Sequence, residues 1–489
     1  MLFMGIDIGS SGCKVSVTDH LGEIHFSSHR SYSFTYTDNT SELDPLLVWE
    51  KVKDAVKEAT SECRGEKIEI VSATSFGEMI VLSDDEGNPL CNSISYGDKR
   101  GREQIERIAS DIGADKIYSI TGTTPDAMYS LAKLLWIKEN DAKVYEKTKR
   151  INLFADFILQ KLGAKFHMDY SLASRTQIFD VKSRCWSDEI LKCANIKREL
   201  FPDVIPAGTP VGNVKKEFAD ELGLSSDTLI LSGGHDQIFA SIGAGILTSG
   251  TALDGMGSNE CIVPVFDSPL IHENMKKSGL ACVPYPIENK YVTYAFSRTC
   301  ASIIDWYRNL MGSMSYDELF SEIEEIPSNV LFLPHFLGAA TPYMDDDSKG
   351  AFFGLTLGTK RSEITKAIID GFNYEMKVNL DTLNGAGFEI STLLVCGGLS
   401  QNDKVLQTKA DILGIKVQRL HTPNTGTLAV AVFGCVAKGI YENLETAMKS
   451  LVKITDEFIP DEKKHLLYME QYEKYKRLYP ALKAVEKGV

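Results

Sequence analysis

Ten residues near the start of the chain, Asp7 to Ser16, combine the groups that bind phosphate. The apolar run Leu2 to Ile8 is typical of a buried strand, and Val15 to Thr18 alternates like a second one, so Gly9 to Gly12 falls in the turn between them. Glycines leave the N–H groups of such a turn open to an anion, and serine hydroxyls add further donors. The phosphate contacts expected here are Gly9, Ser10, Ser11 and, as a positive charge, Lys14.

Asp7 ends the first of these strands and is expected to face the same phosphates. Because a carboxylate repels phosphate unless a cation lies between them, the pattern predicts Mg²⁺ held by Asp7 through water. The alternative interpretation is an ordinary β-turn, which a short motif does not exclude. A second segment favours phosphate, since Asp254-Gly-Met-Gly-Ser repeats the strand, the acidic residue and the Gly-Ser turn. Two such hairpins would hold one polyphosphate from both sides, the second through Gly257 and Ser258.

Asp236 follows another glycine break, at a point where a catalytic base is expected. Thr228 to Ser232 has the pattern of an apolar strand that breaks at Gly233 and Gly234, and a small-residue helix follows from Ile238. Backbone donors at the start of a helix keep a carboxylate ionised, so Asp236 is predicted to be a general base with an ordinary, unshifted pKa. The alternative is a purely structural helix N-cap.

Polar residues also follow two other strand patterns in the first half of the chain. The apolar run Ile68 to Ala73 opens into a loop that contains Glu78, and a second pattern from Ser93 ends in a polar, glycine-containing loop. Loops after strand ends are where open α/β sheets bind ligands, although any single charge there is more typical of a solvated loop. The residues expected to contact a polar small molecule are Glu78, Met79, Tyr96, Asp98, Arg100 and Gln237.

A third glycine junction lies in the second half of the chain. The strand pattern Leu393 to Cys396 runs into two glycines, and a helix pattern follows from Asp403 to Leu413. Exposed backbone at such a junction accommodates a flat ring such as adenine, and a tight strand-to-helix connection explains the pattern equally well. The contacts expected for adenosine are Gly397, Gly398 and Asn402.

The composition is that of an ordinary globular protein, with 43% hydrophobic and 24% charged residues among 489. The net charge of −15 disfavours nucleic acid and anionic membrane surfaces as partners. Ten scattered cysteines without a Cys-x-x-Cys pair argue against zinc and disulfides, so a cytoplasmic location is expected. No secretory leader opens the chain, and the longest small-apolar stretch, Thr427 to Ala437, is too short to span a membrane. His25 and His29 lie in a strand-like segment, where their spacing does not suit a metal site.

Strands and helices alternate along the chain, which predicts an α/β fold. The chain is long enough for two domains, and the boundary expected near Gly245 to Thr251 gives residues 1–246 and 247–489. Periodicity predicts helices at 45–63, 128–140, 151–162, 302–310, 362–383 and 403–413, the second burying Leu131, Leu134, Leu135 and Trp136. Apolar runs predict strands at 68–73, 228–232, 330–334 and 393–396, and 201–214 is expected to be a proline-rich connector.

With these motifs in this order, nearly the whole chain resembles the FGGY carbohydrate kinases, which belong to the wider fold of actin, hexokinase and the heat-shock chaperone ATPases. Asp7-Ile-Gly-Ser-Ser is similar to the family's first phosphate motif, and Gly234-His-Asp-Gln to the segment with its catalytic aspartate. Cys396-Gly-Gly-Leu-Ser-Gln-Asn, with Lys409 to Gly414, resembles the adenosine motif. The two family signatures are matched by Ser130, Lys133, Trp136, Glu139 and Asn140, and by Gly350 to Leu355 with Glu363, Ala367, Asp370 and Gly371.

The departures from the family pattern fall mainly where the acceptor is expected. The Gly-Gln-Met-His segment of the xylulokinases is replaced by Gly77-Glu-Met-Ile, so the histidine expected near the sugar is absent. Tyr96-Gly-Asp stands where many members have Trp-Asn-Asp or Trp-Gln-Asp. The adenosine motif has two consecutive glycines where three are frequent. These changes leave the identity of the sugar open.

The resemblance implies an ATP-dependent enzyme that phosphorylates a hydroxyl of a small sugar or polyol, a ketopentose such as xylulose being the leading acceptor. It implies two ribonuclease-H-like α/β domains closing over a cleft, and in-line transfer with Asp236 as base and Mg²⁺ near Asp7 and Asp236. Two alternatives stay open: a kinase for a non-sugar hydroxylated signal molecule, and a nucleotide-gated switch like the chaperone ATPases. A homodimer also stays open.

Overall fold

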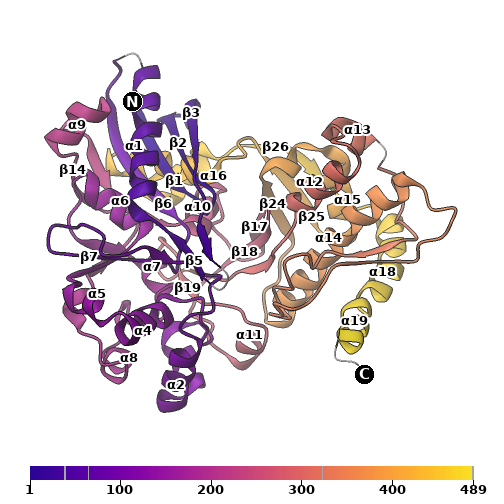
Figure 1. The fold of residues 1–489 in the computed structure, drawn as a ribbon. Coiled ribbons are helices and arrows are strands. Elements are labelled where there is room, and N and C mark those ends of the chain that lie inside the picture. Colours follow the sequence, from indigo (N-terminus) through magenta and orange to yellow (C-terminus); the bar gives the residue numbers. More distant parts are fainter. Residues whose placement is uncertain (38–39, 64, 322, 487–489) are drawn as a thin grey trace.

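The computed structural model describes residues 1–37, 40–63, 65–321 and 323–486, which form two α/β halves (Figure 1). The sheet of the first half has the order β14-β15-β6-β1-β2-β3, with the short β16 beside β6. Its strands are β1 (Leu2–Ile8), β2 (Gly12–Asp19), β3 (Ile24–Ser31), β6 (Ile68–Ser75), β14 (Pro210–Asn213), β15 (Leu229–Leu231) and β16 (Gly234–His235).

The sheet of the second half has the order β19-β20-β18-β17-β24-β25-β26, with β21 beside β18. Its strands are β17 (Thr251–Met256), β18 (Glu260–Phe266), β19 (Val283–Pro284), β20 (Tyr291–Val292), β21 (Ala295–Ser297), β24 (Thr392–Cys396), β25 (Lys416–Leu420) and β26 (Ile454–Phe458).

The two sheets repeat one topology. In the first, β3, β2 and β1 form an antiparallel meander, β6 and β15 run parallel to β1, and β14 is an antiparallel edge. In the second, β20, β18 and β17 form the meander, β24 and β25 are the parallel strands, and β26 is the edge. The prediction of two ribonuclease-H-like α/β units is therefore confirmed. The hairpins β1–β2 and β17–β18 hold equivalent positions.

Short sheets and helices surround these two sheets (Figure 1). The small sheets contain β4 (Thr35–Thr37), β5 (Thr40–Leu43) and β8 (Ser93–Ile94); β7 (Ile80–Ser83) and β9 (Arg150–Leu153); β10 (His167–Asp169) and β13 (Asp203–Ile205); β11 (Phe179–Asp180) and β12 (Cys185–Trp186); and β22 (Leu331–Leu333) and β23 (Ala351–Phe353). The helices of the first half are α1 (Pro45–Glu62), α2 (Arg102–Ile112), α3 (Ala114–Thr121), α4 (Ser130–Asn140), α5 (Ala142–Lys147), α6 (Phe154–Leu162), α7 (Tyr170–Ser174), α8 (Asp188–Cys193), α9 (Lys216–Leu222) and α10 (Asp236–Gly243). Those of the second are α11 (Glu273–Lys277), α12 (Ala301–Leu310), α13 (Tyr316–Ser321), α14 (Arg361–Gly385), α15 (Asp403–Leu413), α16 (Thr425–Ala437), α17 (Leu444–Leu451), α18 (Glu462–Tyr475) and α19 (Leu478–Glu486).

Helix α16 comes late in the chain but packs on the sheet of the first half (Figure 1). Its Val430 lies so close to β1 that a Cβ added at Gly5 would be 3.2 Å from Cγ2 of Val430. The ring of Phe433 lies 5.1 Å from that of Phe239 on α10. One buried cluster therefore joins both halves, and α10 and α16 lie at its centre. The predicted domain boundary at residue 246 stays a prediction. The last three residues of the predicted second domain, 487–489, lie outside the described part of the chain.

Four sequence expectations differ from the structure. The helix expected at 151–162 begins at Phe154, because Arg150–Leu153 pairs with β7 as strand β9. The connector 201–214 contains strands β13 and β14, and the strand expected from Ser93 is two residues long. Trp136 is only partly buried, and the guanidinium of Arg100 lies over its ring, 5.0 Å from the ring centre. None of the described helices combines the length and the apolar character needed to cross a membrane.

Candidate active site

Asp236 is the first residue of α10, directly after the glycine break. A Cβ at Gly233 would lie 1.9 Å from the carbonyl oxygen of Ala73, and one at Gly234 would lie 2.6 Å from Phe239, so the turn requires glycine at both positions. The N-cap of α10 is His235, and its side chain makes no capping bond. Oδ1 of Asp236 accepts the N–H of Gln237 at 2.6 Å. Asp236 is therefore not the helix N-cap, and this position argues against a purely structural capping role for its side chain.

The carboxyl of Asp236 lies among other acidic groups. Burial, followed by the carboxylates of Asp7 and Glu78, raises its pKa to about 7, and the N–H of Gln237 and the guanidinium of Arg175 act against this rise. The expectation of an ordinary, unshifted aspartate is therefore wrong, because sequence did not show how many acids meet here. A group that titrates near neutrality suits general-base chemistry better than a fully ionised one.

Asp7 lies at the end of β1, opposite Lys14 in the hairpin register. Burial raises the pKa of Asp7 to about 6, and the Lys14 ammonium group acts against this rise. Nζ of Lys14 donates to Oδ1 of Asn424, at the N-cap of α16, so its charge is already engaged with the second half. Lys14 thus lies near the expected phosphate site but is tied to an interdomain contact.

The donor set fits Mg²⁺. Asp7 and Asp236 place two carboxylates in one electrostatic neighbourhood, and such a pair favours a cation between them. Mg²⁺ is usually held by one or two carboxylates, with water and substrate phosphates completing its ligands. The described residues contain no cluster of three or more His, Cys, Asp or Glu side chains arranged for a metal. The protein would therefore supply Asp7 and Asp236, and the nucleotide the rest.

The first hairpin has the closed turn that the sequence predicts. The N–H of Gly9 donates to the carbonyl of Gly12 at 2.9 Å, and a Cβ at Gly12 would lie 2.6 Å from the carbonyl oxygen of Arg30. The hydroxyl of Tyr32 donates to the carbonyl of Gly9 at 2.6 Å. A pocket of about 440 Å³ opens beside this turn, and its lining includes Ser10, Ser11, Tyr32, Phe34, Tyr36 and Tyr96.

The second hairpin is anchored differently. The carbonyl of Gly257 accepts the N–H of Ala301 at 3.0 Å, and that of Ser258 accepts the N–H of Cys300 at 2.8 Å, so the turn is docked on the start of α12. Asp254 does not face this turn, because its fully buried carboxylate lies 2.8 Å from Nζ of Lys409. Lys409 also pairs with the buried Glu260. The two hairpins have equivalent positions in their sheets, but their acidic residues differ in role: Asp7 lies at the expected phosphate site, whereas Asp254 forms a buried ion pair.

The glycine junction of the second half leaves exposed backbone. Gly397 has φ +96°, and a Cβ there would lie 2.4 Å from the carbonyl oxygen of Met256, whereas a Cβ at Gly398 would meet nothing within 4 Å. Asn402 caps α15 by accepting the N–H of Val405 at 3.1 Å. A pocket of about 390 Å³ adjoins this segment, lined by Asp317, Phe320, Ser321, Gln401, Asn402, Asp403 and Lys404.

The residues expected to contact the acceptor separate into two groups. Burial and the carboxylates of Glu78 and Asp236 raise the pKa of Tyr96, so these three side chains share one site. Gln237 follows Asp236 in the first turn of α10. Asp98 and Arg100 instead form a tight pair, which also engages the N–H of Ser41 and the carboxylate of Glu42. Met79 is fully buried in the hydrophobic core of the first half, which leaves no surface of it for a substrate.

Sequence reasoning missed four residues that surround Glu78 and Asp236. Arg175 pairs with Glu78, and its guanidinium carbon lies 5.1 Å from the ring centre of Tyr129 and 5.6 Å from that of Tyr294. Nε2 of His235 lies 3.4 Å from Oδ1 of Asp236. Burial, together with the charge of Arg175, lowers the pKa of His235 well below its usual value. No motif in the sequence points to these residues, and Arg175 stands out only as the single basic residue of segment 171–181.

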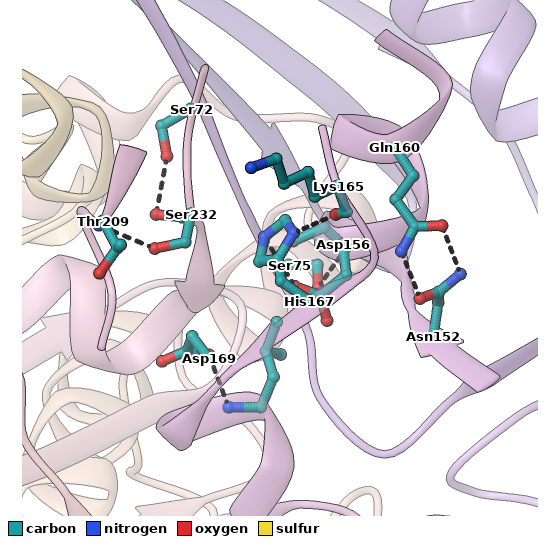
Figure 2. Close-up of polar contacts among 12 residues, drawn as sticks. Ser72, Ser75, Asn152, Asp156, Gln160, Lys165, His167, Asp169, Thr209 and Ser232 are labelled. Carbon is teal, nitrogen blue, oxygen red and sulfur yellow. Dashed lines mark hydrogen bonds and ion pairs between the residues drawn. The ribbon is translucent and has the colours of Figure 1, made fainter. Parts of the chain in front are cut away.

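A layer of buried polar side chains in the first half includes Asp156, His167 and Asp169 (Figure 2). Asp169 caps α7 by accepting the N–H groups of Ser171 and Leu172, each at 2.8 Å. The hydroxyl oxygen of Ser171 in turn accepts the N–H of His235 at 2.9 Å. Asp156 is fully buried beside Asp169, and burial raises its pKa well above the ordinary value. This layer fixes the backbone that presents Asp236.

Comparison with known proteins agrees with this geometry. Residues 2–243 match the model of the FGGY family of carbohydrate kinases, N-terminal domain, and residues 270–438 match that of the C-terminal domain. A xylulose kinase of Lactococcus lactis is 26% identical over 97% of this chain and 96% of its own, and a glycerol kinase of Saccharolobus islandicus is 28% identical over the same shares. The crystal structure of a ligand-bound xylulose kinase from Lactobacillus acidophilus superimposes with a TM-score of 0.90, at 23% identity over 99% of this chain and 98% of that one.

Proposed function

Because this chain belongs to the FGGY family of carbohydrate kinases and phosphorylates a sugar or polyol, we propose that it transfers the γ-phosphoryl group of ATP in line to an acceptor hydroxyl, with Asp236 as the base. The observation that carries the proposal is the carboxyl of Asp236, held at the start of α10 with a pKa raised to about 7. A ketopentose such as xylulose is the leading acceptor, since a xylulose kinase is among the relatives.

The side chains divide the work of the reaction. Asp236 accepts the proton of the acceptor hydroxyl, while Glu78 and Tyr96 orient the acceptor beside it. The turns at Gly9–Gly12 and Gly257–Ser258 bind the phosphates through backbone N–H groups, and the segment Gly397–Asn402 receives adenosine. Bound Mg²⁺, held by Asp7 and Asp236, would supply charge neutralisation.

A nucleotide-gated switch of the chaperone ATPase type is the second candidate function, and a kinase for a hydroxylated signal molecule is the third. The switch needs neither an acceptor pocket nor a base. The pocket lined by Ser10 and Tyr96, and the raised pKa of Asp236, favour a kinase over the switch. The signal-molecule kinase shares all these features and differs in its acceptor alone. Strong stimulation of ADP release by ketoses or polyols excludes the switch and favours a sugar.

The replacement Asp236→Asn tests the base. Asn keeps the shape of the side chain and accepts hydrogen bonds, but it does not take the hydroxyl's proton, so kcat is expected to fall by roughly a hundredfold to ten-thousandfold. Binding of sugar and ATP, measured by calorimetry, should persist. A folded variant that keeps more than about a tenth of normal kcat would exclude Asp236 as base.

Asp188→Asn provides the matched control for this test. Asp188 is also the first residue of a helix, α8, but its side chain is exposed, and no hydrogen bond or ion pair among the described residues joins it to a residue assigned to the site. The same chemical change at the same helical position should leave kcat unaltered. Melting temperatures of both variants distinguish a loss of catalysis from a loss of folding.

A further inference from the structure

Glu78 and Arg175 form a buried ion pair next to Asp236. Nε of Arg175 donates to Oε1 of Glu78 at 2.5 Å, and a second guanidinium nitrogen contacts the same oxygen. The two side chains are 7% and 8% exposed. Within the residues that the structure describes, no hydrogen bond reaches Oε2 of Glu78. One oxygen of the carboxylate is thus occupied by Arg175, and the other is available to a ligand hydroxyl.

Arg175 has little freedom to leave this position. Its guanidinium lies over the ring of Tyr129 and over that of Tyr294. Its stem crosses Gly77, where an added Cβ would lie 2.6 Å from Cγ and 2.9 Å from Cβ of Arg175. The backbone at Glu78 has φ +67°, in the left-handed region that residues other than glycine rarely adopt. Arg175 therefore holds the Glu78 carboxylate in one orientation.

The other basic residues at the site are engaged as well. Arg100 donates to Asp98 and Glu42, and Nζ of Lys133 donates to the backbone carbonyls of Asp98 and Arg100. Lys14 is held by Asn424. Glu78 and Asp7 meanwhile add negative charge around Asp236. None of these cations is available to an anionic acceptor.

We propose that the Glu78–Arg175 pair restricts this kinase to uncharged polyhydroxy acceptors and excludes sugar acids, with Arg175 as the positioning residue and Glu78 as the acceptor contact. This inference rests on the proposed kinase function. A neutral sugar offers hydroxyl protons to Oε2 of Glu78. An aldonate whose reacting hydroxyl lies at Asp236 would instead bring its carboxylate into a site where Glu78 is negatively charged and the cations named above are engaged, and like charges in contact cost several kcal/mol in binding.

The first measurement compares neutral and acidic acceptors with the unaltered enzyme. ADP release is followed with ketopentoses, pentitols and glycerol on one side and with gluconate and other aldonates on the other. The best neutral acceptor is expected to exceed every aldonate by at least roughly a hundredfold in kcat/KM. An aldonate that equals or exceeds the neutral acceptors overturns the inference.

The second measurement removes the charges one at a time. In Glu78→Gln the guanidinium of Arg175 loses its carboxylate, so the ratio of kcat/KM for gluconate to that for the best neutral acceptor should rise by roughly tenfold or more. In the double variant Glu78→Gln/Arg175→Met this gain should vanish, because the cation responsible for it is gone. A gain that persists in the double variant, or no gain in Glu78→Gln, overturns the assignment.

The positioning role of Arg175 is tested by Arg175→Lys, which keeps the charge but loses the forked donor. KM for the neutral acceptor should rise by roughly tenfold while KM for ATP stays within about twofold. An unchanged acceptor KM contradicts the role. The double variant contains no unpaired buried charge, so it keeps the test informative if a single variant folds poorly.

The exposed pair Arg107–Glu139 supplies the control. The variant Glu139→Gln/Arg107→Met makes the same chemical changes on the surface and should alter neither specificity nor KM. Failure of the inference and failure of the proposed function are separable. An enzyme that phosphorylates no acceptor at all refutes the function, whereas one that phosphorylates aldonates as well as neutral sugars refutes the inference alone.

Discussion

Lys409 shows how much a single buried charge is expected to contribute to this molecule. Its ammonium group is fully buried with the carboxylates of Asp254 and Glu260, which are also fully buried. Breaking a buried ion pair by removing one partner typically costs about 3–5 kcal/mol, since the remaining charges keep their desolvation penalty. We expect Lys409→Met to lower the free energy of unfolding by about this amount in urea titrations.

Lys216 offers the matched comparison for that prediction. It pairs with Asp220 one turn along α9, and both side chains are well exposed. Exposed pairs of this kind contribute less than about 1 kcal/mol, so Lys216→Met should leave the unfolding midpoint nearly unchanged. Similar losses in the two variants would mean that burial does not decide the contribution of Lys409.

Single residues also show how much of the site could be predicted from the sequence. Asp7, Glu78, Tyr96 and Asp236 were named from motifs and strand ends, and the structure brings them into one electrostatic neighbourhood. Arg175 was not named, because 97 residues separate it from Glu78 and nothing in a linear pattern pairs them. For the same reason the pKa of Asp236 was misjudged: it depends on side chains from three distant segments.

At the scale of elements, the crossing of α10 and α16 depends on one glycine. A Cβ at Gly243 would lie 1.8 Å from the carbonyl oxygen of Thr425, a backbone atom that moves only with its helix. Gly243→Ala should therefore separate the helices and lower the free energy of unfolding by about 3 kcal/mol. Thermal and urea denaturation measure the loss, and acceptor KM should rise with it, because α10 begins at Asp236.

Gly426 lies on the other helix of this crossing and tests whether contact is the cause. A Cβ there would meet nothing within 4 Å. Gly426→Ala should be neutral or stabilising by up to about 1 kcal/mol, since alanine restricts the unfolded chain and favours the helix. If both alanines destabilise equally, crowding at Gly243 is not the reason.

Elements with strong periodicity were predicted best from sequence. The expected helix 403–413 agrees with α15 at both ends, where Asn402 caps it and Gly414 follows in the left-handed region. The sequence assigns residues 151–153 of strand β9 to a helix, because an alternation over four residues is too short to indicate a strand and their pairing partner, β7, lies far back in the chain. Long-range pairing, rather than local propensity, decided the misassigned segment.

For the whole molecule, we expect the two halves to close when the acceptor binds. The phosphate turns belong to different sheets, so approach of the halves would bring both to one nucleotide and expel water that otherwise hydrolyses it. Small-angle scattering with sugar and a non-hydrolysable nucleotide should show a smaller radius of gyration than the free protein. Identical profiles under conditions where calorimetry shows sugar binding would contradict closure.

The position of α16 has a consequence for the history of such a molecule. Two sheets with one topology point to a doubled unit, yet the helix that covers β1 belongs to the second copy. A single unit ending near residue 246 would leave the apolar face around Phe3 and Ile70 without its cover. An ancestor of one unit would thus have needed a second copy to cover this apolar face. After fusion, neither half would fold stably if the other were deleted.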